Sequence, residues 1–94
     1  MSVGFDQRVE IPDDVSMNVL KGEAVLLNLV DETYYGLDEV GTSMWIRLRD
    51  SDSIQDAYES LLAEYEVDPE VLRRDLEELI EKLAARGLIK LGSA

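Results

Sequence analysis

The sequence predicts an α+β fold, winged-helix-like, in which a three-stranded antiparallel β-meander precedes three α-helices. Two observations predict it. Residues 15–37 hold short apolar runs separated by turn residues, which is typical of strands, whereas residues 39–86 hold apolar residues at helical spacing. A chain of 94 residues is short enough for a single core, so we expect one domain over residues 1–94.

Three runs of residues predict the strands. Val15–Leu20 alternates in polarity, Ala24–Val30 is almost continuously apolar, and Thr33–Leu37 is rich in aromatic residues. The continuous run is typical of a strand that is central in its sheet or covered on both faces. Lys21-Gly22 and Asp31-Glu32 supply the turns between the runs. Because such short connections join antiparallel neighbours, the three strands should form a meander.

Capping residues and apolar spacing predict the three helices. Asp38 and Ser53 are candidate N-caps of the first two, and Val40, Met44 and Leu48 should form the buried face of the first. Trp45, beside that face, is also expected in the core. The third helix should begin after Asp68, with Pro69 in its first turn, and should end at Arg86 before Gly87. Its expected buried stripe is Leu72, Leu76, Leu79, Ile80 and Leu83.

The two ends of the chain are less regular. Residues 7–11 predict a further extended segment whose neighbour in the fold is left open. Leu88–Leu91 should form a short extended tail, and Gly92–Ala94 is expected to fray.

The composition excludes several classes of chemistry. The chain has no Cys, no His and no glycine-rich phosphate motif, so we expect no catalysis, no cofactor and no metal. The net charge of −12 repels phosphate backbones and anionic headgroups, so neither nucleic acid nor a membrane is expected as a partner. The sequence shows no secretory signal and no apolar run of membrane-spanning length, and the cytoplasm is the expected location.

The third strand is the place where the sequence suggests binding. An edge strand presents unpaired backbone groups, and Thr33–Leu37 carries neither charge nor proline to block the addition of another strand. Of Tyr34 and Tyr35, one should face outward, because neighbouring side chains of a strand point to opposite faces. A flank of the third helix, Val71, Asp75, Glu78 and Lys82, could form the rim of a groove or a solvated surface. The same edge could instead serve a structural or dimerisation module.

Two segments carry a resemblance to a known family. LLNLVDETYYGLDEVGTSMW (residues 26–45) and EYEVDPEVLRRDLEELIEKLAARGLI (residues 64–89) resemble, in order and spacing, the PqqD-like proteins, which are also called precursor-peptide recognition elements. The resemblance implies that a leader peptide binds as a fourth antiparallel strand between the third strand and the third helix. It implies a peptide-binding set made of Val30, Thr33, Tyr34, Tyr35, Gly36, Leu37, Val71, Leu72, Asp75, Leu76 and Leu79.

The resemblance also implies a pathway and partners. A free-standing chain with the EV-G-x-x-x-W pattern of residues 39–45 looks closest to the members that serve lasso-peptide assembly. Such members hand the bound precursor to a separate leader peptidase and a cyclase. For this chain we expect a monomer. The alternative within the family is the pyrroloquinoline quinone type, which presents its precursor to a radical S-adenosylmethionine enzyme.

Overall fold

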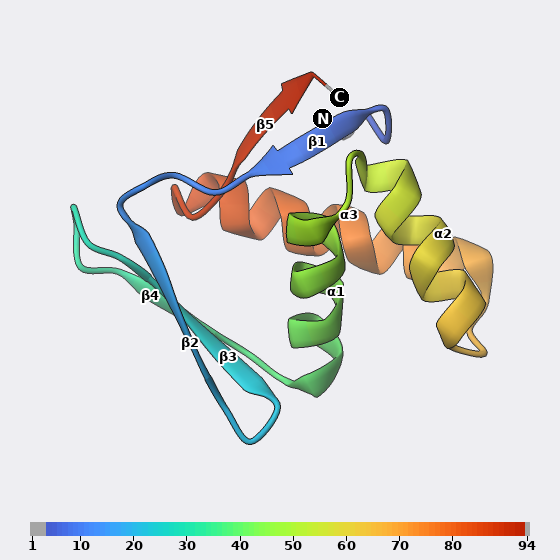
Figure 1. Cartoon of the computed structure of the whole chain (residues 1–94), viewed down its shortest axis with the longest axis horizontal. Coiled ribbons are helices and arrows are strands. Elements are labelled where there is room, and N and C mark those ends of the chain that lie inside the picture. Colours follow the sequence, from blue (N-terminus) through green and yellow to red (C-terminus); the bar gives the residue numbers. More distant parts are fainter. Residues whose placement is uncertain (1–3, 94) are drawn as a thin grey trace.

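A computed structural model describes residues 4–93 of the chain and has the α+β architecture that the sequence predicts (Figure 1). A three-stranded antiparallel sheet precedes three helices, and a second, two-stranded sheet joins the two ends of the chain. The elements are β1 (Gln7–Glu10), β2 (Val15–Leu20), β3 (Glu23–Asn28), β4 (Tyr34–Leu37), α1 (Glu39–Asp50), α2 (Ile54–Glu64), α3 (Pro69–Ala85) and β5 (Lys90–Ser93).

The larger sheet has the order β2–β3–β4, so β3 is central as predicted. The two-residue turn between β2 and β3 has positive φ at both Lys21 (55°) and Gly22 (80°), which suits the right-handed twist of a hairpin. β3 ends at Asn28, two residues earlier than expected. The backbone N–H of Val30 donates to the side-chain Oδ1 of Asn28 at 2.9 Å, and this local bond turns the chain out of the strand. Val30 therefore lies in the turn rather than in β3.

The end of the chain is not frayed, contrary to expectation. Gly92 and Ser93 belong to β5, which pairs with β1 in the register Gln7↔Ser93 to Glu10↔Lys90. This pairing also gives the extended segment of residues 7–11 its neighbour. Both strands are short and lie at opposite ends of the sequence, so no local sequence pattern predicts that they pair. Ala94 lies outside the described residues.

The helix caps match the prediction. The carboxylate of Asp38 accepts from the backbone N–H of Gly41 at 2.7 Å, and Ser53 Oγ accepts from the N–H of Asp56 at 3.1 Å. Asp68 Oδ1 accepts from the N–H of Glu70 at 2.9 Å, just before α3 begins. Gly87 follows α3 with a φ of +70°, the left-handed conformation that commonly ends a helix. Each helix thus begins at a side chain that accepts from a free backbone N–H, and α3 ends at a glycine.

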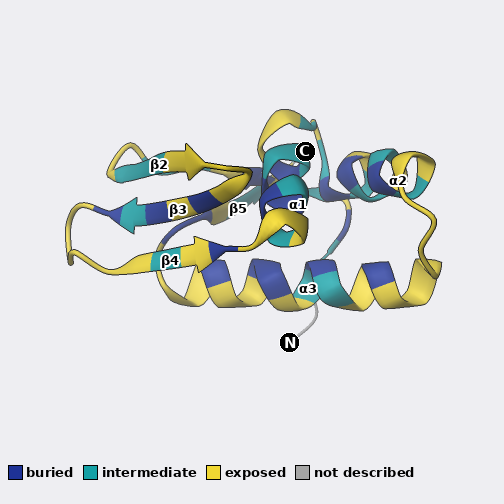
Figure 2. Cartoon of the chain, turned by 90° about the horizontal axis from the view of Figure 1, so that it is seen from below, coloured by how far each residue is buried: buried dark blue, intermediate teal, exposed yellow. Residues whose placement is uncertain are grey.

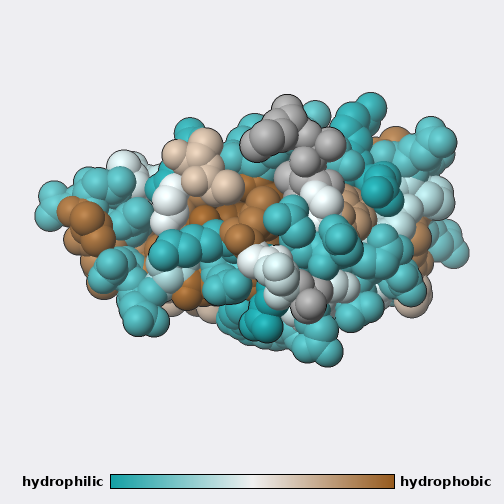
Figure 3. All heavy atoms as spheres, turned by 90° about the horizontal axis from the view of Figure 1, so that it is seen from above, coloured by the Kyte–Doolittle hydropathy of each residue, from teal (hydrophilic) through white to brown (hydrophobic). Residues whose placement is uncertain are grey.

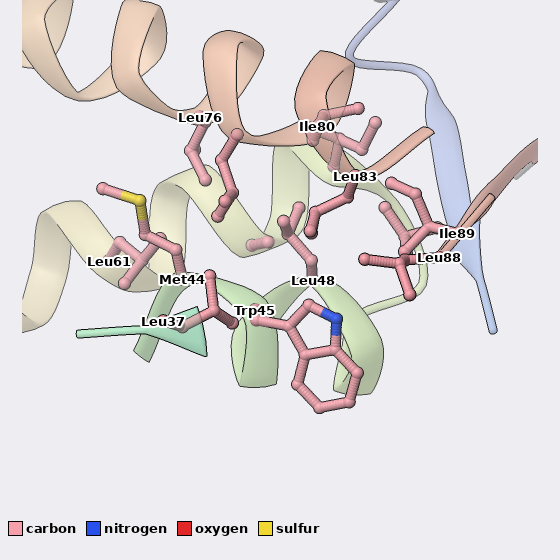
Figure 4. Packing of buried hydrophobic residues seen from close by; sticks show 14 of the residues in the cluster. Leu37, Met44, Trp45, Leu48, Leu61, Leu76, Ile80, Leu83, Leu88 and Ile89 are labelled. Carbon is pink, nitrogen blue, oxygen red and sulfur yellow. The ribbon is translucent and has the colours of Figure 1, made fainter. Parts of the chain in front are cut away.

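The core lies where the three helices and the inner face of the sheet meet (Figure 4). Trp45 is 2% exposed, as expected, and the predicted stripe of α3 is buried along its whole length. Figure 2 shows this stripe as the dark side of α3 turned toward the rest of the molecule. Val40 is an exception, because it is 63% exposed at the start of α1, where neither sheet nor helix covers it. No helix among residues 4–93 is both long and apolar enough to cross a membrane.

Candidate functional site

β4 is an edge strand, and its register decides which of its backbone groups are available. The N–H of Asn28 donates to the carbonyl oxygen of Thr33 at 2.8 Å, so this pair is a hydrogen-bonded one. In an antiparallel ladder such pairs recur at every second residue, which turns Tyr35 and Leu37 toward β3 as well. The backbone N–H and C=O groups of Tyr34 and Gly36 therefore point to the open edge.

The side chains of β4 divide between the two faces of the sheet. Leu37 is buried and Tyr35 is partly buried against the core, whereas Tyr34 on the opposite face is 73% exposed. The outward tyrosine expected from the alternation is thus Tyr34. Gly36 shares the outer face with Tyr34, and a Cβ added to it would meet no atom within 4 Å. The open edge is consequently unobstructed by its own side chains.

Helix α3 lies on the β4 side of the sheet, and β2 lies on the far side (Figure 2). At the C-terminal end of α3, the guanidinium of Arg86 lies over the ring of Tyr35 on β4, 5.0 Å from its centroid. Elsewhere the two backbones scarcely approach one another. Within residues 4–93, only the β4 edge of this sheet has a helix beside it.

A hollow of about 280 Å³ opens next to the C-terminal end of β4. It is continuous with the strand along the chain, because Leu37 is followed at once by the first turn of α1, whose Glu39 and Val40 line it. Its walls are mainly apolar, and its polar groups include a hydroxyl pair in which Ser43 Oγ and Tyr65 Oη are 3.0 Å apart. The lining residues are Glu39, Val40, Ser43, Met44, Leu61, Tyr65, Val67, Val71, Leu72 and Asp75.

The predicted site residues on α3 fall into two groups. Val71, Leu72 and Asp75 line the hollow, whereas Leu76 is completely buried and Leu79 almost so. Leu76 and Leu79 therefore belong to the core beneath the surface, since their side chains offer almost nothing to a ligand in this conformation. The remaining predicted residues lie on β4 or in the turn before it: Val30, Thr33, Tyr34, Tyr35, Gly36 and Leu37.

Sequence reasoning missed the part of the hollow that comes from α1 and α2. Val40 and Met44 were assigned to the helix core by their spacing, and Tyr65 and Val67 follow α2 in an irregular segment. Val67 lies beyond the apolar stripe of α2, and this position was the signal that could have found this part of the hollow. Among the described residues no group of carboxylates is arranged to hold a metal ion.

The turn that precedes β4 is held by its own acidic residue. Asp31 Oδ1 accepts from the backbone N–H of Thr33 at 3.0 Å and from its hydroxyl at 2.7 Å. These bonds favour the charged form, and the Thr33 hydroxyl is the main cause that lowers the pKa of Asp31. The hydroxyl of Thr33 is thus engaged within the turn and directed at Asp31.

Comparisons with known proteins agree with this architecture. Two solved structures are similar over most of their length. One, described as "TbiB1 in Complex with the TbiA(beta) Leader Peptide", is 34% identical, covers 86% of this chain and 94% of its own, and has a TM-score of 0.79. The other, "Lasso peptide synthetase B1 complexed with the leader peptide", is 25% identical, covers 88% and 98%, and has a TM-score of 0.78. A search of curated protein sequences found no match.

A family model identifies the relationship directly. The model for coenzyme PQQ synthesis protein D (PqqD) matches residues 23–89, which run from β3 to the end of the segment after α3. The matched part includes β4, the hollow and all of α3, and it is well over half of the chain. The chain belongs to the PqqD family.

Proposed function

We propose that this protein binds the leader segment of a ribosomally made precursor peptide in lasso-peptide biosynthesis, as a fourth antiparallel strand on the open edge of β4. The observation that carries the proposal is the outward direction of the Tyr34 and Gly36 backbone groups next to α3. Both similar solved structures are described as complexes with a leader peptide, which supports the same ligand class here.

The hollow would receive the part of the peptide that precedes the added strand. β4 runs toward the hollow, so the N-terminal side of an antiparallel peptide reaches it first. Each added main-chain hydrogen bond contributes about 0.5–1.5 kcal/mol, and each buried apolar anchor about 1.5–3 kcal/mol. After the cost of association, a micromolar affinity or better, about −8 kcal/mol, is within reach. The exposed parts of Val71 and Asp75 are the groups that we assign to this contact.

The proposed role is delivery rather than catalysis. A chain without His or Cys lacks the usual general base and the usual nucleophile, so a bound precursor would be processed by separate enzymes, a leader peptidase and a cyclase. The family description points to coenzyme PQQ synthesis, where a radical enzyme would take the peptidase's place. The similarity to the structure described as lasso peptide synthetase B1 complexed with the leader peptide, which covers 88% of this chain, favours the lasso pathway.

The outer face of the sheet leaves room for such an enzyme. Leu20, Val25 and Tyr34 are exposed on the face that turns away from the core, and no described element covers them. A second copy of the chain would be a poor occupant, because two chains of net charge −12 repel one another. We therefore expect a monomer that meets its processing enzyme with this face free.

The experiment that tests the proposal is amide hydrogen exchange by NMR, with and without a synthetic peptide that has the sequence of the cognate leader. Tyr34 and Gly36 should exchange fast in the free protein and slowly in the complex, because only their N–H groups gain a partner. Tyr35 and Leu37 should change less, because their amides already face β3. This alternation distinguishes strand addition from a general tightening of the protein.

The opposite edge of the same sheet provides the internal control. Met17 and Val19 on β2 alternate in the same way and face solvent on the far side from α3. Their exchange rates should not change when the peptide binds. Protection on β2 instead of β4, or none on either strand at saturating peptide, would show that the proposed site is wrong.

A further inference from the structure

We infer that Asn28 is a positioning residue, which holds the sheet at a fixed distance from the C-terminal end of α3 and thereby shapes the peptide site. The inference rests on the proposed function, since it assigns a role to a residue that would not touch the peptide. Asn28 ends β3, and its position on the inner face follows Ala24 and Leu26 in alternation. An apolar residue would be expected there, and a buried amide needs a reason.

The reason lies in the partners of the side chain. Nδ2 of Asn28 donates to the carbonyl oxygen of Gly87 at 3.3 Å, across 59 residues of sequence, while Oδ1 accepts from the N–H of Val30 at 2.9 Å. The side chain thus bonds at once to the turn before β4 and to the segment that leaves α3. Asn28 is only 8% exposed, so water does not easily replace either bond.

The geometry of Gly87 depends on the same contact. Its φ of +70° directs the carbonyl toward the sheet, and a Cβ at this residue would come within 3.1 Å of Nδ2 of Asn28. The close approach and the positive φ both call for glycine. A glycine after α3 thus allows the carbonyl oxygen of residue 87 to accept from the side-chain amide of Asn28.

The site has a fixed point at each end. At the C-terminal end of β4, Thr42 on α1 joins Ala24 to Leu37 through its hydroxyl. At the N-terminal end, the Asn28–Gly87 bond and the stacking of Arg86 on Tyr35 join the sheet to α3. Between these points β4 and α3 scarcely approach each other. A strand added beside β4 would occupy a space whose width is set by the two ends, so loosening one end should loosen the bound peptide.

The test compares Asn28→Asp with Asn28→Ser and the matched control Asn18→Asp. Aspartate keeps an acceptor for Val30 but has no N–H for Gly87, and serine is too short to reach Gly87. Asn18 is exposed on β2, so its substitution makes the same charge change away from the site. The probe is the synthetic cognate leader peptide, and the readouts are Kd, the dissociation rate and the exchange protection of Tyr34 and Gly36.

We expect both Asn28 variants to raise Kd about tenfold, mainly through faster dissociation, with weaker protection of Tyr34 and Gly36, while Asn18→Asp binds as the wild type. Serine serves as the second variant in case the aspartate protein does not fold. A folded Asn28 variant that has lost thermal stability but retains the wild-type Kd and dissociation rate would reduce Asn28 to a purely structural role. In that outcome the proposed function still stands if the wild type shows the alternating protection. If the wild type does not bind the peptide at all, both proposals fall.

Discussion

The hydroxyl oxygen of Thr42 accepts a hydrogen bond from the backbone N–H of Ala24 at 2.8 Å and donates to the carbonyl of Leu37 at 3.4 Å. Ala24 and Leu37 are directly opposite in the β3–β4 register, so the hydroxyl stands between two backbone groups that would otherwise face each other across the ladder. Both residues and Thr42 are buried. The end of β4 is thus fixed to α1 by one side chain.

Replacing Thr42 by valine should destabilise the protein by about 1–3 kcal/mol, because the buried N–H of Ala24 would lose its partner while the packing volume stays the same. Thr42→Ser keeps the hydroxyl and should cost about 1 kcal/mol, the value of the lost methyl group. Urea unfolding measures both. A larger loss for Thr42→Ser than for Thr42→Val would mean that packing, and not the hydrogen bond, is what Thr42 contributes.

Thr33→Val should raise the pKa of Asp31 toward its ordinary value of 3.8, since the Thr33 hydroxyl is the main cause of the lowered pKa. The return should be partial, because the backbone N–H of residue 33 still donates to the carboxylate. A carboxyl with a lowered pKa stabilises the fold above its unfolded pKa, and this contribution is lost as the pH falls through the folded value. NMR titration of the Asp31 side-chain carboxyl carbon follows the change, and an unaltered pKa in the variant would contradict it.

Gly87→Ala should destabilise the fold by about 1–2 kcal/mol, because the residue has a φ of +70° and its new Cβ would crowd Asn28. Gly36→Ala is the matched control, since Gly36 has neither a positive φ nor an atom within 4 Å of an added Cβ. Its free energy of unfolding should change by less than about 0.5 kcal/mol. Thermal unfolding measures the stability of both variants. Equal losses would contradict the role assigned to Gly87.

Val71→Asp should weaken binding of the cognate leader peptide about tenfold or more, because an anchor in the hollow would lose an apolar wall and meet a carboxylate. Asp75→Ala, on the same wall, should also weaken binding and raise Kd. The unfolding free energy of Val71→Asp should hardly fall, since Val71 is exposed in the first turn of α3, where a negative charge suits the helix dipole. Calorimetric titration gives Kd.

Glu78→Ala is the control for these two variants, because Glu78 is exposed on α3 but does not line the hollow. It should bind the peptide like the wild type. Wild-type affinity in the Val71 and Asp75 variants would show that the hollow is not part of the peptide site, which would then consist of the β4 edge only.

Local patterns were sufficient for most of the fold. Capping residues such as Asp38 and Asp68, and apolar spacing such as the stripe of α3, are signals within one helix, and the structure confirms them. The β1–β5 pair could not be foreseen, because Val9 and Leu91 meet only after the chain has folded and neither strand alternates clearly. Pairing between distant segments depends on the packing of everything between them.

The candidate site was predictable only in part, for a related reason. The edge strand follows from the strand order, which short turns already determine. The hollow needs the ends of three helices at once, and no spacing in the sequence relates Val40 to Tyr65 or Val71. Leu76 was expected both in the buried stripe of α3 and in the peptide-binding set, and the structure confirms its burial in the core. A helical wheel gives the direction of a side chain but not the depth of its surroundings.

The burial of Trp45 decides how this protein can be observed in solution. It is the chain's sole tryptophan, and it is enclosed by the core. Its fluorescence should therefore be blue-shifted, resistant to quenching by iodide and responsive to unfolding. The space-filling view in Figure 3 displays a surface of mixed polar and apolar character. Optical titrations with a peptide will need a dye on the peptide itself, whereas the intrinsic signal supplies a clean record of folding.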